Sequence, residues 1–556
     1  MNRPTPAIVA QAAVRRLPRV ALILLCIAYV LPGFVGREPW KAQDMTAFGY
    51  MFELARGATS WLAPTLLNQP PEFDGLLPYW LGAGFIRAFA GWLPADVAAR
   101  LPFAGLLALT LAATWWGIYH LARRPQAQPL AFAFGGEADP TDYARAMADA
   151  GLLALIASLG MAQLSHETTP ALAQLGFAAL AFHGLAALPR AGSLGVLSAA
   201  AGLLGLGLSG APSTALLLAL GGAALLFLDR PAKDDNAFAP RHGEPVAAQT
   251  CRGWPWGLAL LVVACVVVAL ASGLSLWRWR VSVAEHDWRA QGRLLLWFTW
   301  PAWPLAMWTL WRWRWQLSSH HIALPLWFLA VTTVAALAGT HADRSLLLGL
   351  PALAALAAFA LPTLRRVVSA FIDWFTLLFF SGCALVIWVV WISLQTGFPA
   401  KPAANVAKLA PGFTPSFSLF AFVVALAGTL AWAALVRWRA GRHQEALWKS
   451  LVLPAGGAVL CWLLLMTLWL PVLDYARSYV PAVRGVTRAL TQPGCVEVAG
   501  LNRGQIAALR FHGGLTLREA QAKPQCPWRV LPADLPPELA ATLRMDAWKQ
   551  VATVRR

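Results

Sequence analysis

Long apolar runs separated by short polar segments dominate this sequence. Each run has roughly the 20 apolar residues that a helix needs to cross a bilayer. The pattern therefore predicts an all-α polytopic membrane protein with about 13 transmembrane helices. The predicted spans cover residues 18–36, 98–121, 147–164, 168–188, 194–209, 211–228, 255–277, 294–311, 321–339, 345–363, 371–395, 415–436 and 450–472.

Two shorter apolar segments, residues 45–55 and 76–92, lie between the first and second spans. Their length and amphipathic pattern predict helices that lie in the membrane interface rather than across it. Residues after the last span have the composition of a small water-soluble α/β domain. We therefore expect a transmembrane domain of residues 1–472, with its first loop at 37–97, and a C-terminal domain of residues 473–556.

The overall composition agrees with a membrane protein. Of the 556 residues, 58% are hydrophobic and 13% are charged, and the mean hydropathy is +0.57. Soluble proteins carry about 25% charged residues, so the composition excludes a soluble globular chain. The 29 Trp residues fit as well, because Trp gathers at membrane interfaces.

The distribution of basic residues predicts an orientation in the membrane. The formal net charge is +18, but the cations form short clusters between apolar runs, which argues against a nucleic-acid-binding face. The positive-inside rule then predicts a multi-pass protein with a cytoplasmic N-terminus and a C-terminal domain on the outer side of the membrane. The inside clusters are Arg123 and Arg124, Arg190, Arg230 with Lys233 and Arg241, Arg312 and Arg314, Arg365 and Arg366, and Arg437, Arg439 and Arg442.

Acidic residues are scarce and gather at the external ends of the spans. Glu167, preceded by His166, follows the third span, and Asp343 with Arg344 follows the ninth. An ion-coupled transporter would more typically place its carboxylates near the bilayer midplane. The pattern instead predicts a site at one membrane surface, half in lipid and open to water. The acidic residues of the first loop are Glu38, Asp44, Glu53, Glu72 and Asp74.

One chemistry suits such a site. A sugar carried on a polyprenyl phosphate keeps its lipid tail in the bilayer and its head group at the surface. A carboxylate could take a proton from the acceptor as a general base, and Arg or Lys could neutralise the phosphate leaving group. The sequence contains no Walker loop and no dinucleotide-binding fingerprint, and this chemistry needs neither.

The first loop also carries a family motif. Residues 38–49, Glu-Pro-Trp-Lys-Ala-Gln-Asp-Met-Thr-Ala-Phe-Gly, resemble the first-loop motif of the GT-C membrane glycosyltransferases, which include the lipid-A aminoarabinose transferases and the protein O-mannosyltransferases. Residues 74–83 look like the second interfacial helix of that superfamily. Residues 166–170 resemble its acidic segment after the third span, and residues 343–351 resemble its later basic-Leu-Leu-Pro segment. The resemblance implies that the membrane is a bacterial inner membrane and that its outer side, with the C-terminal domain, is the periplasm.

The sequence departs from the family pattern at two places. The acidic pair of the first loop appears as Gln43-Asp44, which leaves one carboxylate. The family's Glu-Lys before the second interfacial helix appears as Phe73-Asp74, so the Lys that should meet phosphate is missing there. Another external cation would have to replace it, and the candidates are Lys41, Arg278, Arg280 and Arg344.

The resemblance suggests roles for the acidic residues. Asp44 is the expected general base, and its structural alternative is to cap the N-terminus of the following helix. Glu167 is expected to be a second acid that orients the acceptor or holds a metal. His166 and Asp74 are expected to contact the substrate. No cofactor is required, and a divalent metal is left open.

The C-terminal domain contains Cys495 and Cys526, the only cysteines after the last span. A periplasmic compartment is oxidising and would allow a disulfide between them. The other cysteines lie in spans or in an inside loop, and no CxxC pair suggests a metal site.

The sequence therefore predicts a glycosyltransferase that moves a hexosyl or pentosyl group from a polyprenyl-phosphate donor to a periplasmic lipid, glycan or protein. The expected partners are this donor, the acceptor and membrane lipids, without nucleic acid. A transporter or flippase for a lipid-linked or anionic substrate is the first alternative. A non-catalytic envelope-assembly protein with the same fold is the second, and the absence of a carboxylate at Gln43 favours it.

The predicted orientation can be tested with fusions to a phosphatase that is active only outside the cytoplasm. Fusions after residue 475 should be active, and fusions within residues 231–250 should be inactive, because positively charged loops stay inside. The opposite pattern of activity would remove the predicted periplasmic site.

Overall fold

The computed structural model describes residues 5–72, 75–228, 253–277, 287–339, 341–441, 446–521, 523–536, 538, 543 and 548–554. Three of the predicted site residues, Asp74, Arg278 and Arg280, lie outside this part of the chain.

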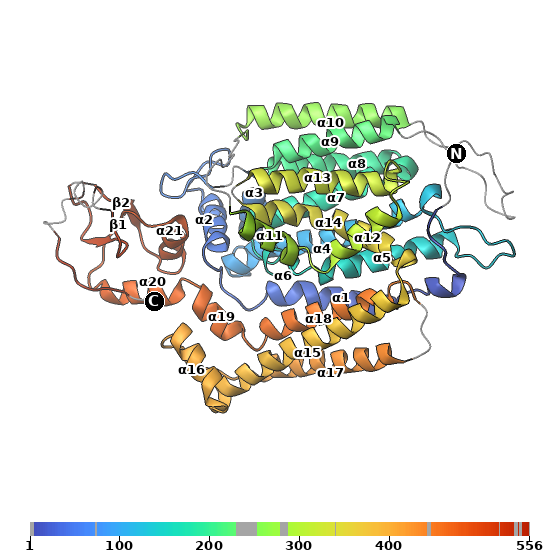
Figure 1. The fold of residues 1–556 in the computed structure, drawn as a ribbon. Coiled ribbons are helices and arrows are strands. Elements are labelled where there is room, and N and C mark those ends of the chain that lie inside the picture. The colour runs from blue at the N-terminus through green and yellow to red at the C-terminus, as the bar shows by residue number, and fades with distance from the viewer. Residues whose placement is uncertain are drawn as a thin grey trace.

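The described chain forms a bundle of long helices with a small domain at one end (Figure 1). Among the residues that the structure describes, seven helices are long and apolar enough to cross a membrane, or eight if the bent pair α18 and α19 counts as one span. The chain is therefore a multi-pass membrane protein. Helices lie at every predicted span: α1 (Arg19–Val30), α4 (Ala95–Ala122), α5 (Pro140–Ala157), α7 (Pro170–Ala191), α8 (Ser193–Leu208), α9 (Pro212–Leu228), α10 (Gly253–Gly273), α11 (Trp288–Phe298), α12 (Ala302–Arg312), α13 (His320–Ala338), α14 (Ala342–Ala360), α15 (Arg366–Thr396), α17 (Leu419–Ala440) and α18 (Lys449–Leu465).

Helices α7 and α14 lie at the centre of the bundle and pack against each other; α7 also packs against α4 and α8, and α14 against α4 and α5. Close packing is possible here because the facing residues are small. A Cβ atom on Gly184 of α7, for example, would lie 2.2 Å from the backbone nitrogen of Ala199 in α8. Helices α15 and α17, joined through α16 (Ala400–Leu409), form an outer layer on α18, whereas α10 lies at the opposite side (Figure 1).

Two predicted spans differ from the observed helices. The span predicted at 294–311 is two helices, because Pro301 follows α11 and cannot continue its hydrogen bonding. The span predicted at 147–164 runs instead from Pro140 to Ala157. Its start is fixed by Asp139, whose side chain accepts hydrogen bonds from the backbone N–H groups of Thr141 and Asp142.

The first loop contains two helices, α2 (Gln43–Ala55) and α3 (Leu77–Ala88), at the positions predicted for interfacial helices. Helix α2 is more enclosed than an interfacial helix, and Met45, Tyr50 and Leu54 are fully buried. It is covered by α21 (Arg503–Phe511) of the C-terminal part. The two helices meet so closely that a Cβ atom on Gly49 would lie 2.5 Å from the Cβ of Ala507.

The C-terminal part begins after α19 (Leu470–Arg477), and its first element is α20 (Val480–Ala489). It has a three-stranded parallel sheet with the order β2-β1-β3, in which Val496 of β1 pairs with Leu517 of β2 and Trp528 of β3. The strands are β1 (Val496–Val498), β2 (Leu517–Glu519) and β3 (Trp528–Val530), and α21 connects β1 to β2. We call residues 480–554 the C-terminal domain. The end of the helix bundle that this domain covers is called the domain end.

Cys495 and Cys526 form a disulfide across this small domain, with their Cα atoms 5.2 Å apart. The bond closes a loop of about 30 residues, which in the chain-entropy model stabilises the fold by roughly 3–4 kcal/mol. Alkylation of the unfolded, unreduced protein should therefore label neither residue, while the other cysteines serve as positive controls. Labelling of both thiols before reduction would contradict the bond.

Candidate functional site

Charged side chains from distant parts of the sequence meet at the domain end. They come from the first loop, from the first turns of α4 and α14, from the segment before α7, and from the C-terminal domain. Buried charges in proteins are normally paired. A charged group whose polar atoms are all bound within the protein is structural, whereas a group with an exposed polar atom can contact a substrate. The charged residues of this cluster are Arg37, Glu38, Asp44, Glu72, Asp96, Arg100, Glu167, Arg344 and Arg503.

Asp44 is held from three directions. Its Oδ2 atom accepts hydrogen bonds from Nη1 of Arg37 at 2.7 Å and from the backbone N–H of Trp40 at 3.1 Å. Its Oδ1 atom accepts a hydrogen bond from the backbone N–H of Thr168 at 2.8 Å. The N-cap residue of α2 is Ala42, so the alternative role of Asp44 as a helix cap is wrong.

The environment of Asp44 keeps it ionised. Burial alone would raise the pKa of this carboxyl, but the charges of Arg37 and Arg100 and the two backbone N–H donors hold the pKa below its usual value. The side chains of Asp44 and Arg37 are 1% and 2% exposed. Asp44 is therefore a charged joint between the first loop and the start of α7, with both oxygens engaged.

Arg37 completes this joint. Its Nε atom donates to the carbonyl oxygen of Gly33 at 2.8 Å, and its Nη2 atom donates to that of His166 at 2.7 Å. The guanidinium group also stacks 4.6 Å from the ring centre of Trp40. A single Arg side chain thus connects the end of α1, the start of α2 and the segment before α7.

Glu167 lies in the same segment but is in a different state. It is half-buried, and Oε1 accepts a hydrogen bond from Nε2 of Gln163 at 3.1 Å. Burial and the nearby negative charge of Asp44 raise the pKa of Glu167, against the opposing effects of Arg37 and Arg344. A carboxylate with a raised pKa and an accessible face is suited to accept a proton.

Arg344 lies in the first turn of α14, where it interacts electrostatically with Asp343, Glu167 and Glu72. The predicted phosphate-binding Arg344 and the predicted acid Glu167 therefore lie within electrostatic range of each other. Lys41 is directed elsewhere, because its Nζ atom lies 4.8 Å from the ring centre of Tyr479 beside the C-terminal domain.

His166 is enclosed by protein. Its Nε2 atom lies 2.9 Å from the carbonyl oxygen of Tyr29, and its Nδ1 atom lies 2.5 Å from that of Ala162. Its ring packs 4.5 Å from Trp462, and burial lowers its pKa to about 4. This neutral imidazole lies within the packing between α1 and α18, and its surroundings leave no free face for a substrate.

Asp96 and Arg100 are members of the cluster that sequence reasoning missed. Nη2 of Arg100 lies 3.2 Å from the Asp96 carboxylate, one helical turn away on α4. Arg100 also interacts with Arg37, Asp44 and Glu38, so it adds a positive charge beneath the first loop. The i,i+4 spacing of opposite charges at the start of a predicted span was the available signal.

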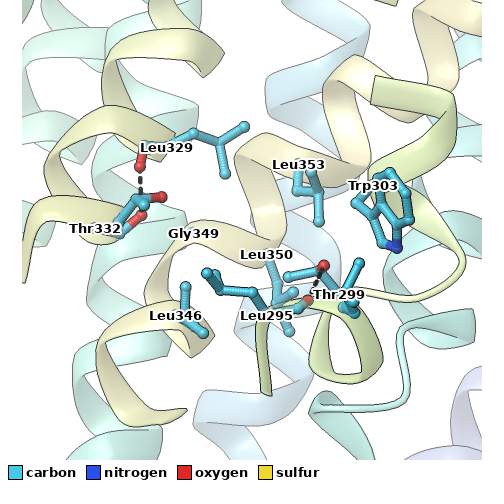
Figure 2. A pocket seen from close by; sticks show the side chains of 11 residues that line it. Leu295, Thr299, Trp303, Leu329, Thr332, Leu346, Gly349, Leu350 and Leu353 are labelled. Atoms are coloured by element: carbon cyan, nitrogen blue, oxygen red, sulfur yellow. Dashed lines mark hydrogen bonds between the residues drawn. The ribbon is translucent and has the colours of Figure 1, made fainter. Parts of the chain in front are cut away.

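An apolar cavity lies beside the Arg344 turn of α14. It has a volume of about 260 Å³ and lies between helices α11 to α14. Figure 2 shows Leu295, Trp303, Leu346 and Leu350 around this cavity, with Thr299 as one of its few polar residues. Its lining suits a hydrocarbon chain and offers no strong ligand to a metal. Among the described residues, no group of three His, Cys, Asp or Glu side chains could hold a metal ion.

Comparison with known proteins identifies the fold. No protein-family model matches the chain, and no curated protein matches it either. It is similar to the crystal structure of ArnT from Cupriavidus metallidurans in the apo state, at 15% identity and a TM-score of 0.54 over 95% of this chain and 87% of that chain. It is also similar to the same protein bound to undecaprenyl phosphate, at 15% identity and a TM-score of 0.56 over 90% and 86% of the two chains. ArnT is a lipid A aminoarabinose transferase with the GT-C fold. The chain therefore has a GT-C-type fold, which confirms the fold expected from the first-loop motif.

The Arg37–Asp44 joint predicts a large loss of stability on substitution. Asp44→Asn would leave the Arg37 guanidinium buried without its charge partner, which typically costs about 3–5 kcal/mol. The double variant Arg37→Gln/Asp44→Asn should recover part of this loss. Thermal unfolding in detergent would measure both effects.

The control is Asp142→Asn, which breaks two solvent-exposed ion pairs, one with Arg16, whose side chain is 63% exposed, and one with Arg145, whose side chain is 32% exposed. Such exposed pairs contribute about 0–1 kcal/mol, so little change is expected. The hydrogen bond from Nε2 of Gln11 can still be accepted by the Asn side-chain oxygen. Equal stability of Asp44→Asn and the parent protein would show that the buried pair does not fasten the loop.

Proposed function

We propose that this protein is a glycosyltransferase that uses a polyprenyl-phosphate-linked sugar as donor and a lipid, glycan or protein as acceptor. The observation that carries the proposal is the proximity of Glu167 and Arg344 at the domain end of a GT-C-type bundle. The solved ArnT structure with bound undecaprenyl phosphate supports this class of donor.

In the proposed reaction, an acceptor hydroxyl or amino group attacks the sugar carbon that is bonded to phosphate. The new bond forms as the bond between this carbon and the phosphate oxygen breaks, and the polyprenyl phosphate leaves. Glu167 takes the proton of the acceptor, for which its raised pKa and half-exposed position are suitable. Arg344 neutralises the charge that develops on the phosphate.

Asp44 has a positioning role in this proposal. Its carboxylate is charged, but Arg37, Trp40 and Thr168 occupy its oxygens. It keeps the segment that carries Glu167 against the first loop and raises the pKa of Glu167 by its negative charge. The expected general base therefore moves from Asp44 to Glu167.

The apolar cavity is separate from the phosphate-binding position proposed at Arg344. It begins near Leu346, two residues after Arg344, and continues along α14 to Leu353. Because successive helical residues turn by about 100°, these lining residues lie on the face of α14 away from Arg344, so the cavity offers apolar space between the helices but does not form one pocket with a phosphate at Arg344. The polyprenyl chain of the donor would lie in the bilayer.

The proposed location is a bacterial inner membrane with the domain end in the periplasm. Arg123 and Arg190 lie at the C-terminal ends of α4 and α7, and Nη1 of Arg190 donates to the carbonyl oxygen of Arg123 at 3.1 Å. The two basic loops therefore lie together, at the bundle end away from Glu167. The positive-inside rule assigns this end to the cytoplasm.

One observation favours a second function, that of a non-catalytic envelope-assembly protein with the same fold. Asp44 lies in the motif that resembles the family's catalytic loop, yet its oxygens are occupied within the protein. A protein that had lost catalysis could keep this pair purely for stability. A transporter or flippase would likewise move lipid-linked sugars without transferring them.

Mass spectrometry of envelope lipids and glycans can separate these functions. Cells that lack the protein should lose a sugar modification, which the parent protein restores. Glu167→Gln should reduce transfer by at least about 100-fold, because a general base contributes about 10²–10⁴-fold. Transfer by the parent should also rise with pH through the raised pKa of Glu167, and this dependence should vanish in Glu167→Gln.

Glu519→Gln, which changes an exposed carboxylate of β2, is the matched control and should transfer at the parental rate. Parental transfer by Glu167→Gln would remove Glu167 as the base. An unchanged envelope in cells without the protein would favour the assembly function, and accumulation of an unmoved lipid-linked sugar would favour a flippase.

A further inference from the structure

Glu72 forms an ion pair with an arginine of the C-terminal domain. Its Oε1 atom is 3.1 Å from Nη1 of Arg503, in the first turn of α21. Its charge also acts on Arg344, in the first turn of α14. The C-terminal domain thus brings a cation to a carboxylate that lies within the electrostatic range of Arg344.

We infer that Glu72 is an internal counter-ion that occupies the place of the donor phosphate, and that Arg503 is a second phosphate-binding residue beside Arg344. This inference rests on the proposed function. When the donor binds, its phosphate replaces the Glu72 carboxylate as the anion near the two guanidinium groups. The phosphate of the intact donor is a diester with one negative charge, as a carboxylate has, and its oxygens can accept paired hydrogen bonds from both arginines. The polyprenyl phosphate that leaves is a monoester with more negative charge, so the two arginines bind it more strongly than they bind Glu72.

Because the ion pair between Arg503 and Glu72 is partly exposed to solvent, breaking it costs little free energy. The side chains of Arg503 and Glu72 are 29% and 41% exposed, and ion pairs that reach solvent are weak. Arg503 also lies near Tyr50 of α2, on whose hydroxyl group its charge acts. That hydroxyl group is fixed by hydrogen bonds to the carbonyl oxygens of Gln69 and Pro70, so the surroundings of Arg503 do not depend on Glu72.

A neighbouring ion pair attaches the C-terminal domain to the first loop. Arg510, at the other end of α21, pairs with Glu53 of α2, whose side chain is 3% exposed. Phe511 packs beside it against Phe48 and Phe52. This buried group attaches the C-terminal domain to the first loop, so Arg503 and Glu72 are not needed for docking.

Binding of undecaprenyl phosphate to the full-length protein in detergent tests the inference. Arg503→Gln should raise the dissociation constant about tenfold, because one charge-assisted contact to phosphate is lost. Glu72→Gln should lower the dissociation constant several-fold, because a competing negative charge is removed. Arg510→Gln is the matched control, and once its folding is verified it should bind like the parent. Undecaprenol, which lacks phosphate, should not distinguish the parent from any variant.

Opposite effects at the two residues are the decisive result. Equal weakening in Arg503→Gln and Arg510→Gln would reduce Arg503 to a docking contact and overturn the inference. Weaker binding in Glu72→Gln would show that this carboxylate supports the site rather than competing for it, which also overturns the inference. In both cases the parent still binds undecaprenyl phosphate. A parent that does not bind it at all would overturn the proposed function itself.

Discussion

The buried ion pair between Arg37 and Asp44 is the interaction on which the domain end depends. Two charges with almost no exposure are stable only with close partners, and here every oxygen of Asp44 has one. Because Arg37 also binds the carbonyl oxygens of Gly33 and His166, the pair fixes the ends of α1, α2 and α7 relative to one another. The position of Glu167, one residue before Thr168, follows from this joint.

The C-terminal domain extends the same principle to the rest of the first loop. Helix α21 can approach α2 because Gly49 has no side chain against Ala507. The approach brings Arg510 to Glu53 and Arg503 to Glu72, so carboxylates of a loop meet cations from more than 400 residues away. One pair is buried and the other reaches solvent, so a single helix provides both a firm attachment and a charge that a ligand can reach.

The sequence predicted the parts of this architecture that depend on local pattern. Apolar runs located the helices, and the motif around Asp44 indicated the GT-C fold. Local pattern could not show that Asp44 pairs with Thr168, because that contact joins segments 124 residues apart. The alternative role of Asp44 as a helix cap was wrong for this reason, and its expected role as the base gives way in our proposal to a positioning role. The sequence shows Pro301, which breaks the span predicted at 294–311. The prediction missed this break because the residues on both sides are apolar, and hydrophobicity alone does not distinguish one long helix from two short ones.

The two neighbouring carboxylates illustrate how a site can divide its roles. Asp44 and Glu167 share one environment, but Arg37 and backbone donors lower the pKa of the first, while burial and the first carboxylate raise that of the second. Separated pKa values of paired acids assign one group to permanent charge and the other to proton transfer. The pairing of the ionised Asp44 with Arg37 also explains how the loop tolerates Gln43 in place of a second acid. An additional carboxylate there would add negative charge beside a group that already needs Arg37 and Arg100 to remain ionised.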